Sequence, residues 1–306
     1  MARERALVAR ILRSTGIRND DGALVWSGAK TLADSTDISF SSTHSPRGTS
    51  YYSMGWRRVA ACMSDVAAMG AKPLAYFLAL GLPERQASAA LPEIVRGTQD
   101  ACRAHGAHYV GGDTKKAKEI TLAGFALGVL TGTPLFRSLA MPGDVIAVTG
   151  TIGNAFCGRL ALSLSGKDKA RAKPLIASFL KPRARVKPAL AVSSSVQRAA
   201  CMDVSDGLLF TCSELARLGR VKIELEASAI PISPAARAFA GKKKISFRKL
   251  VDSGEDYELV FALSPHDFAR LQKAAGLKRI GVVKKGSGLL LDGRKIATSG
   301  YDAFRN

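Results

Sequence analysis

The chain has 306 residues, of which 47% are hydrophobic and 23% charged, so it can bury an ordinary core in one large domain or two of moderate size. No run of about 20 apolar residues could form a membrane-spanning helix, and residues 1–13 form a charged amphipathic pattern, not a signal peptide. This predicts a soluble cytoplasmic protein. A net charge of +20 favours anionic partners such as nucleotides, phosphorylated metabolites, RNA or anionic membranes, without choosing among them.

Neither the basic residues nor the cysteines form a recognisable binding motif. The basic residues are spread out, with concentrations at 167–187 and 242–249, and because no RNA-binding motif accompanies them, nucleic-acid binding is not expected. The cysteines are odd in number and include no Cys-x-x-Cys pair, which predicts reduced, buried thiols. They are Cys62, Cys102, Cys157, Cys201 and Cys212.

In the first half of the chain, strands and helices alternate. Apolar residues at helical spacing predict a helix over residues 3–15 and another, with one buried face, over residues 51–70. Short strands are expected over residues 22–26 and 30–36. A strand over residues 74–80 and a helix that ends near Gly106 are expected next. A strand that runs into Gly111 and a long strand over 120–130 follow.

Residues 134–143 interrupt this pattern, which restarts with a strand over residues 144–150. The restart predicts a boundary near residue 137, with an N-terminal domain over 1–137 and a C-terminal domain over 138–306. A helix near 154–164, a Pro- and Lys-rich connection, a strand ending at Asp203, a helix over 207–218 and strands over 221–226 and 257–263 complete the second half. Strands and helices in both halves predict an α+β (mixed α/β) fold of two αβ domains.

Acidic residues are scarce, yet eleven of the 25 fall in six short clusters where an apolar strand or helix meets Gly, Ser or Thr. The clusters are NDDG at 19–22, DSTD at 34–37, SDVAAMG at 64–70, GGDT at 111–114, DVSDG at 203–207 and SGEDYE at 253–258. Each alone fits a turn or a helix cap. If they converge in space, mutual repulsion would raise the carboxylate pKa values unless a hard cation lay between them. Oxygen ligands without thiolate or histidine favour magnesium, which also bridges nucleotide phosphates.

Common catalytic signatures are missing from the sequence. It contains no G-x-x-x-x-G-K-[ST] loop, no protein-kinase catalytic-loop motif and no G-x-S-x-G elbow, which disfavours P-loop and protein-kinase folds. The glycine-rich segment GTIGNAFCG at 150–158 fits either a phosphate cradle at a helix start or a plain structural turn.

Taken in order, the acidic clusters resemble the motif series of the thiamine-monophosphate kinase family, part of the superfamily that includes aminoimidazole-ribonucleotide synthetase. The resemblance runs along nearly the whole chain, and MSDVAAMGAKP at 63–73 is its most distinctive segment. The other segments are NDDGALV at 19–25, STD at 35–37 with His44 seven residues later, VGGDT at 110–114, Arg137 ahead of MPGD, DVSDGL at 203–208, SGEDYEL at 253–259 and GYDAF at 300–304. Three features depart from the family pattern: Asn19 replaces a glycine, the loop ISFSSTH at 38–44 is more polar than usual, and His105 replaces a tyrosine common near the nucleotide.

The resemblance implies a magnesium- and ATP-dependent kinase that converts thiamine monophosphate to thiamine diphosphate. It implies a homodimer in which the N-terminal mixed sheet pairs with its twin, while the C-terminal half closes over the nucleotide. Carried over by motif, several magnesium ions would be held by Asp21, Ser35, Thr36, Asp37, Asp65, Asp113, Asp203 and Asp206. The residues that would contact ATP are Gly112, Asp113, Arg137 and Ser205. Those that would face thiamine monophosphate are His44, Glu255 and Tyr301.

The resemblance also implies how catalysis would work, with Asp65, Asp113, Asp203 and Arg137 as the catalytic residues. A phosphate monoester has a second pKa of about 6, so the attacking oxygen of the substrate is already ionised at neutral pH. No strong general base is needed, and direct in-line transfer would rest on positioning and charge neutralisation. The aspartates are therefore interpreted as metal ligands and not as proton acceptors.

Two related enzymes fit the sequence less well. Selenophosphate synthetase needs a reactive cysteine or selenocysteine near the N-terminus, whereas the first cysteine here is Cys62. The hydrogenase-maturation relative needs a C-terminal cysteine, whereas this chain ends in Asn306. Aminoimidazole-ribonucleotide synthetase is an alternative that the SGEDYEL and GYDAF segments disfavour. An RNA-associating protein that retains the fold is a second alternative, motivated by the charge of +20.

Overall fold

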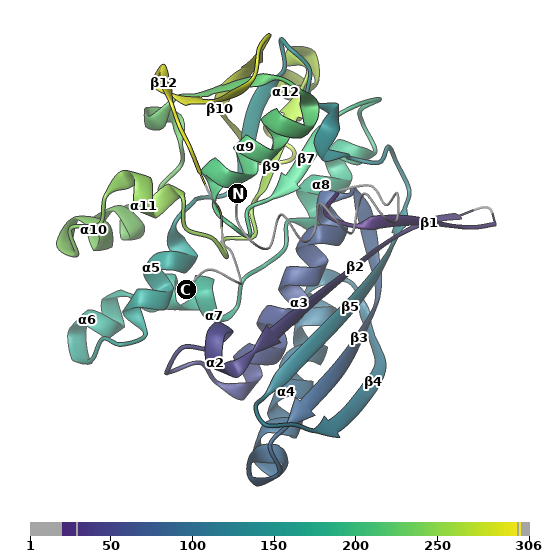
Figure 1. Ribbon diagram of the computed structural model, residues 1–306, viewed down its shortest axis with the longest axis vertical. Helices are drawn as coiled ribbons and strands as arrows, with labels where there is room; N and C mark the ends of the chain where they lie inside the picture. The colour runs from purple at the N-terminus through teal and green to yellow at the C-terminus, as the bar shows by residue number, and fades with distance from the viewer. Residues whose placement is uncertain (1–19, 29, 299, 301–306) are drawn as a thin grey trace.

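The computed structural model describes residues 20–28, 30–298 and 300. These residues form two sheets, each with helices packed against it, and Figure 1 shows the first sheet below the second. The arrangement confirms the predicted mixed α/β fold with two αβ units. The helix expected over residues 3–15 and the expected substrate residue Tyr301 lie outside the described residues.

The first sheet has the strand order β1-β2-β5-β3-β4, and only its β3–β4 pair is parallel. Its strands and helices are β1 (Ala23–Ser27), β2 (Lys30–Phe40), α2 (Ser41–His44), α3 (Tyr51–Ala68), β3 (Ala71–Leu82), α4 (Glu84–His105), β4 (His108–Lys116) and β5 (Thr121–Leu130). Helix α4 provides the crossover that a parallel pair requires. Helices α3 and α4 cover one face of the sheet (Figure 1).

Helix α3 is the buried centre of this half. Ser50 caps its start by accepting a hydrogen bond from the N–H of Ser53 at 3.2 Å, and the chain leaves the helix through Gly70, whose φ is 78°. The sequence predicted one buried face, whereas the helix is buried nearly all round and includes the buried Arg57 and Arg58. The reason is that α3 is enclosed by the first sheet, by α4 and by elements of the second half.

The other face of the first sheet carries exposed apolar side chains. Side chains alternate along each strand, so residues at every second position of β2 face away from α3. Ile38, Phe77 and Phe125 on this outer face are 48%, 41% and 38% exposed, and the rings of Phe77 and Phe125 lie 6.0 Å apart. An apolar surface of this kind, centred on neighbouring strands, is typical of a protein–protein contact.

The second sheet has the strand order β12-β11-β8-β10-β6-β9-β7, and its central strands are buried on both faces. Ile146 and Val148 of β6 pack with residues of α9, while Val145 and Ala147 pack on the opposite side with residues of α8 and α12. The elements of this half begin with η1 (Arg137–Leu139), β6 (Val145–Thr149), α5 (Asn154–Ala161), α6 (Gly166–Arg171), α7 (Lys173–Leu180), α8 (Val186–Ser193), β7 (Ala200–Asp203) and α9 (Leu208–Gly219). They continue with β8 (Lys222–Leu225), η2 (Ala227–Ala229), α10 (Pro234–Lys242), α11 (Phe247–Val251), β9 (Leu259–Leu263), α12 (Pro265–Leu271), β10 (Leu277–Lys284), β11 (Gly288–Leu291) and β12 (Arg294–Lys295).

Several of these elements were not predicted, among them α6, α7 and α8 in the Pro- and Lys-rich connection. Pro174 stands in the first turn of α7, where its missing N–H costs nothing, so proline there begins a helix instead of ending one. The first sheet ends at Leu130 and the second begins at Val145, and the domain division near residue 137 stays a prediction. No helix among the described residues is long and apolar enough to cross a membrane.

The crossing of α3 and α4 depends on two glycines that allow close backbone approach. A Cβ at Gly97 would lie 2.0 Å from the carbonyl oxygen of Tyr52, and a Cβ at Gly55 would lie 2.2 Å from that of Ile94. Gly97→Ala should therefore force the helices apart and lower the free energy of unfolding by about 2 kcal/mol or more. Urea unfolding measures this, with Gly241→Ala in α10 as the control, because a Cβ there meets nothing within 4 Å. Equal effects of the two substitutions would contradict the packing argument.

Candidate active site

Three aspartates from distant parts of the chain meet where the two halves adjoin. Asp21 precedes β1, Asp65 lies in α3 and Asp203 ends β7, and a carboxylate oxygen of each lies within 4.8 Å of those of the other two. Asp203 is 2% exposed, and the Asp21 side chain is 1% exposed. The structure thus brings together these three of the expected metal ligands.

Serine hydroxyls orient the carboxylates of this group. Ser35 of β2 donates to Oδ2 of Asp65 at 2.6 Å. Ser64 and Ser205 donate to Oδ2 and Oδ1 of Asp203 at 2.7 Å and 2.8 Å. Of the expected site residues, Ser35 and Ser205 therefore lie at the cluster, where each holds a carboxylate in place.

Burial raises the pKa of all three carboxyl groups. It raises the pKa of Asp65 well above its ordinary value, and repulsion from Asp203 and Asp21 adds to the effect. For Asp203, burial and then repulsion from Asp21 raise the pKa to about 7. The pKa of Asp21 is raised by burial and pulled back in part by Arg137. Three buried acids that repel one another favour the binding of a cation between them.

The donor set of this cluster fits a hard divalent cation. The three aspartates offer oxygen atoms, which magnesium prefers, and Oδ2 of Asp21 is buried with no hydrogen-bond partner among the described residues. Burial raises the pKa of the neighbouring thiols of Cys62 and Cys201, so these sulfur atoms stay protonated and do not compete as ligands.

Two arginines pair with carboxylates beside the cluster. The guanidinium of Arg137 forms an ion pair with Asp21, and the Arg137 backbone N–H donates to Oδ1 of Asp20 at 3.0 Å. Nη1 of Arg58 lies 2.5 Å from Oδ1 of Asp37, which shares the inner face of β2 with Ser35. Arg137 and Asp37, both expected in the site, therefore lie in its charged surroundings.

Other expected residues lie apart from the three aspartates. Thr36 faces the outer side of the first sheet, and its hydroxyl donates to the carbonyl of Gly124 at 2.9 Å. Asp113 and its neighbour Gly112 lie on the edge strand β4, where the Asp113 side chain is 65% exposed. Two strands, β3 and β5, separate β4 from β2, so Asp113 is about 14 Å from Ile38, the residue of β2 that lies level with it across the sheet.

The DVSDG and SGEDYEL segments form two loops that pack against each other. The N–H of Glu255 donates to the carbonyl of Ser205 at 2.8 Å. A Cβ at Gly254 would lie 1.9 Å from that same carbonyl oxygen, so only glycine fits there. Asp206 lies in this loop pair, beside Gly254, and is partly buried.

Two of the three expected substrate residues, His44 and Glu255, are linked through an arginine that the sequence analysis missed. Nη2 of Arg57 forms an ion pair with the Glu255 carboxylate, and Nη1 donates to the His44 carbonyl at 2.7 Å. Burial, followed by the nearby Arg58 guanidinium, lowers the pKa of His44, so its ring is neutral at pH 7. The third expected substrate residue, Tyr301, lies outside the described residues.

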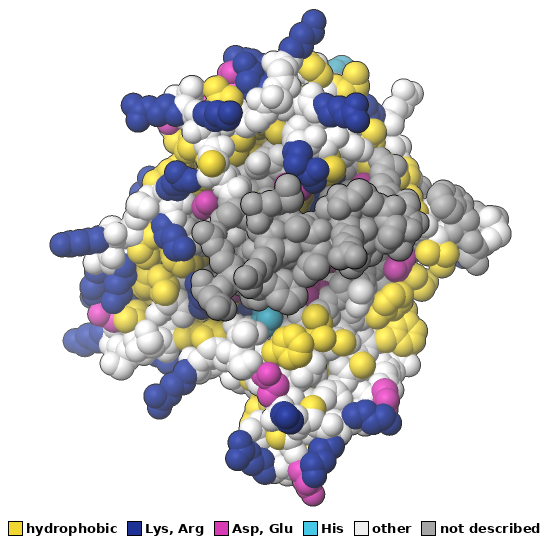
Figure 2. Space-filling model, in the orientation of Figure 1, with side chains coloured by type: hydrophobic (Ala, Val, Ile, Leu, Met, Phe, Trp, Pro, Cys, Tyr) yellow, Lys and Arg dark blue, Asp and Glu magenta, His cyan; other side chains and the backbone are white. Residues whose placement is uncertain are grey.

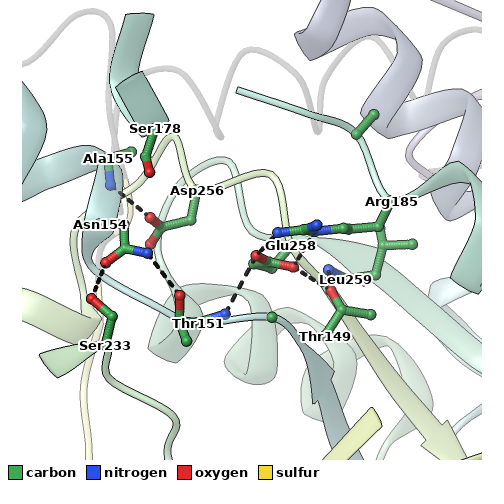
Figure 3. A network of polar contacts seen from close by, with 12 residues as sticks. Thr149, Thr151, Asn154, Ala155, Ser178, Arg185, Ser233, Asp256, Glu258 and Leu259 are labelled. Carbon is green, nitrogen blue, oxygen red and sulfur yellow. Dashed lines mark hydrogen bonds and ion pairs between the residues drawn. The ribbon is translucent and has the colours of Figure 1, made fainter. Parts of the chain in front are cut away.

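The remaining acids of SGEDYEL fix the second half internally, as Figure 3 shows. Asp256 accepts hydrogen bonds from the N–H groups of Gly153 and Ala155 at 2.6 and 2.9 Å, at the start of α5. Glu258 accepts from Thr149 at 2.5 Å and pairs with Arg185. Two N–H donors of the glycine-rich segment 150–158 are therefore hydrogen-bonded to Asp256. This supports the interpretation of the segment as a structural turn and not as a phosphate cradle.

Sequence reasoning missed Arg57, Arg58 and Ser64, although a pattern was present. Arginines in the middle of an apolar helix should have suggested buried partners of opposite charge.

His105, which was expected to stand where the family has a tyrosine near the nucleotide, packs its ring against Trp56. Its Nδ1 lies 2.7 Å from the Ala101 carbonyl and its Nε2 accepts from the N–H of Ala184 at 3.0 Å, so it is a satisfied core histidine.

Family models match both halves of the chain. The N-terminal domain of AIR synthase related protein matches residues 19–130, and the C-terminal domain matches residues 141–291. Together with the two sheets and the buried carboxylates, these matches define an AIR synthase related protein of two domains.

Individual relatives narrow the class. The thiamine-monophosphate kinase of Methanospirillum hungatei is 33% identical over 92% of each chain, and that of Halobacterium salinarum is 34% identical over 97% of this chain and 99% of its own. The solved structure of AaThiL complexed with AMPPCP and TMP superposes with a TM-score of 0.91 at 27% identity, covering 98% of this chain and 97% of that one. The chain belongs to the thiamine-monophosphate kinase family.

The raised pKa values predict how the metal-free protein responds to pH. Between about pH 4 and pH 7 the folded state binds more protons at Asp65 and Asp203 than the unfolded state does, so raising the pH should lower the free energy of unfolding. Asp65→Asn removes one of the repelling charges and should flatten this decline. Urea unfolding with a chelator at about pH 5 and about pH 8 measures it.

The matched control is Asp168→Asn, because Asp168 is an exposed acid whose pKa is lowered by its hydrogen bond to Lys242. This variant should keep the decline of the unmodified protein. A decline of the same size in Asp65→Asn would show that the carboxylates do not repel one another as described.

Proposed function

We propose that this protein transfers the γ-phosphoryl group of ATP to the phosphate of thiamine monophosphate, giving thiamine diphosphate and ADP for thiamine diphosphate biosynthesis. The protein is a kinase by family, and its relative AaThiL was solved with AMPPCP and TMP bound. The observation that carries the proposal for this chain is the meeting of Asp21, Asp65 and Asp203 between its two halves. A cytoplasmic location stays a prediction.

We assign the site residues by charge and position. Asp21, Asp65 and Asp203 would hold magnesium, with Ser35, Asp37 and Asp206 as neighbouring oxygen donors. Bound magnesium would supply positive charge to offset the negative charge of the ATP phosphates. Arg137 and Ser205 would contact the nucleotide, and the guanidinium of Arg137 would offset charge on the transferred group. No described residue is needed as a general base, because the attacking phosphate oxygen is already ionised at neutral pH.

A homodimer would account for the residues that lie apart. The exposed apolar strip of Ile38, Phe77 and Phe125 lies on the outer face of the first sheet. Asp113 shares this face, because its register partner Ala79 is exposed there. A second copy packed on the strip would cover the apolar groups and bring Gly112, Asp113 and Thr36 close to it. We propose this as their route to the nucleotide.

The proposed reaction is tested by incubating the protein with ATP, magnesium chloride and thiamine monophosphate. Thiamine diphosphate and ADP should form in equal amounts, as followed by chromatography. Aminoimidazole precursors serve as the control substrate and should give no product. Product from the control substrate alone would assign the chain to the aminoimidazole-ribonucleotide synthetase branch.

Asp65→Asn should remove magnesium binding and leave the protein folded. We expect AMPPCP with magnesium to raise the thermal midpoint of the unmodified protein by about 4 °C or more, and the variant to lose most of this shift. Its turnover should fall about 100-fold or more at limiting magnesium. A full thermal shift in the variant would remove Asp65 from the metal site.

Glu255→Ala should act on the thiamine substrate and not on the nucleotide. Losing a charge-assisted contact should raise KM for thiamine monophosphate about tenfold, with KM for ATP nearly unchanged. Tyr301, which would offer its ring to the cationic thiazolium or the pyrimidine, should respond in the same way when replaced by alanine. Steady-state kinetics with each substrate varied in turn measure both variants. An unchanged KM in both would place these residues outside the substrate site.

A further inference from the structure

Arg57 is a buried cation in the middle of α3. The residue is 7% exposed, and its side chain is 9% exposed. A buried guanidinium is stable only where its charge is paired and its N–H donors are engaged. The partners of Arg57 therefore show what this residue does.

Those partners come from three other segments of the chain. The ion pair is with Glu255 in the SGEDYEL loop of the second half, and the hydrogen bond of 2.7 Å is to the carbonyl of His44 at the end of α2. The guanidinium also lies over the ring of Phe179 in α7, 4.1 Å from its centroid. One side chain thus joins both halves of the molecule at the two described substrate residues.

The loop that carries Glu255 holds its own backbone in place without Arg57. The N–H groups of Glu255 and Tyr257 donate to the carbonyls of Ser205 and Val204 at 2.8 and 3.1 Å. These bonds keep Glu255 in its left-handed backbone conformation, with a φ of 71°. Arg57 therefore fixes the direction of the Glu255 carboxylate, which is a partly exposed side chain with 32% of its surface open.

The adjacent arginine has a different partner. Arg58 pairs with Asp37, which shares the inner face of β2 with Ser35, whereas Arg57 pairs with Glu255. Neighbouring residues on a helix point about 100° apart, so the two guanidinium groups form their ion pairs with different acids. Replacing Arg57 should accordingly change KM for thiamine monophosphate and leave KM for ATP nearly unchanged.

We propose that Arg57 is a positioning residue for the thiamine substrate. It sets the Glu255 carboxylate and the His44 segment at a fixed separation across the junction of the two halves, so that both can meet the substrate at once. This inference rests on the proposed function, because it assigns Arg57 to the same substrate site. Preorganising two contacts in this way lowers KM without requiring Arg57 to touch the reacting phosphates.

Steady-state kinetics of Arg57→Met and Arg57→Lys test the proposal. Arg57→Met should raise KM for thiamine monophosphate about tenfold, while kcat and KM for ATP change less than about threefold. The KM of Arg57→Lys for thiamine monophosphate should lie between those of the unmodified protein and Arg57→Met. An ammonium group keeps the charge but cannot contact Glu255, His44 and the Phe179 ring together. Arg96→Met is the matched control, because Arg96 also pairs with one acid, Glu93, and lies over one ring, Tyr52, on the surface.

A double-mutant cycle distinguishes positioning from a general effect on the fold. Once Glu255→Gln has removed the carboxylate, adding Arg57→Met should raise KM for thiamine monophosphate by no more than about twofold further. Fully multiplicative effects, or equal increases in KM for both substrates, would overturn the proposal. If Arg57→Met does not fold, as judged by circular dichroism, the same cycle with Arg57→Lys decides.

The outcomes also separate this inference from the proposed function. An unmodified protein that forms no thiamine diphosphate would overturn both. An active unmodified protein whose KM for thiamine monophosphate is unchanged in Arg57→Met would overturn the role of Arg57 alone.

Discussion

Repulsion among three buried carboxylates is the constraint on which the rest of the structure depends. Carboxylate oxygens of Asp21, Asp65 and Asp203 lie within 4.8 Å of one another, so each acid makes ionisation of the others harder. Serine hydroxyls and the Arg137 guanidinium offset part of this cost. A cation bound between the three carboxylates would relieve this repulsion and raise the free energy of unfolding.

Helix α3 makes the arrangement possible because it belongs to both halves. It covers the first sheet, yet Ala67 and Ala68 at its end pack in one core cluster with Val192 of α8 and Phe261 of β9. Ser64, Asp65 and the two arginines are therefore placed by packing from two sides and cannot shift independently of either sheet. The site is as rigid as the junction between the halves.

Much of the fold and part of the site could be predicted from the sequence. Hydrophobic spacing identified α3, β5 and β6, since these are long or fully buried segments with a clear period. The family resemblance marked Asp21, Asp65 and Asp203 as metal ligands, and the structure brings these three residues together. Motif order alone could not separate Ser35 and Asp37 from Thr36, because in a strand adjacent side chains face opposite sides of the sheet.

Other features depend on contacts between residues far apart in sequence. Nothing local to Arg57 reveals that its partner is Glu255, 198 positions later. Within SGEDYEL, only the folded structure distinguishes Glu255, which pairs with Arg57, from Asp256, which caps α5, and Glu258, which binds Arg185. Three acids of the same loop therefore have different roles, which are set by their tertiary contacts.

Because every cysteine is buried, thiol reactivity can be used to follow local unfolding of this protein. All five thiols are free and shielded, and burial raises the pKa of each, so almost no thiolate is available to an alkylating reagent while the chain is folded. Two of them lie in the first half and three in the second. Each thiol should therefore react with an alkylating reagent only after the structure around it has unfolded. The order in which the five cysteines become alkylated would show which half of the kinase unfolds first.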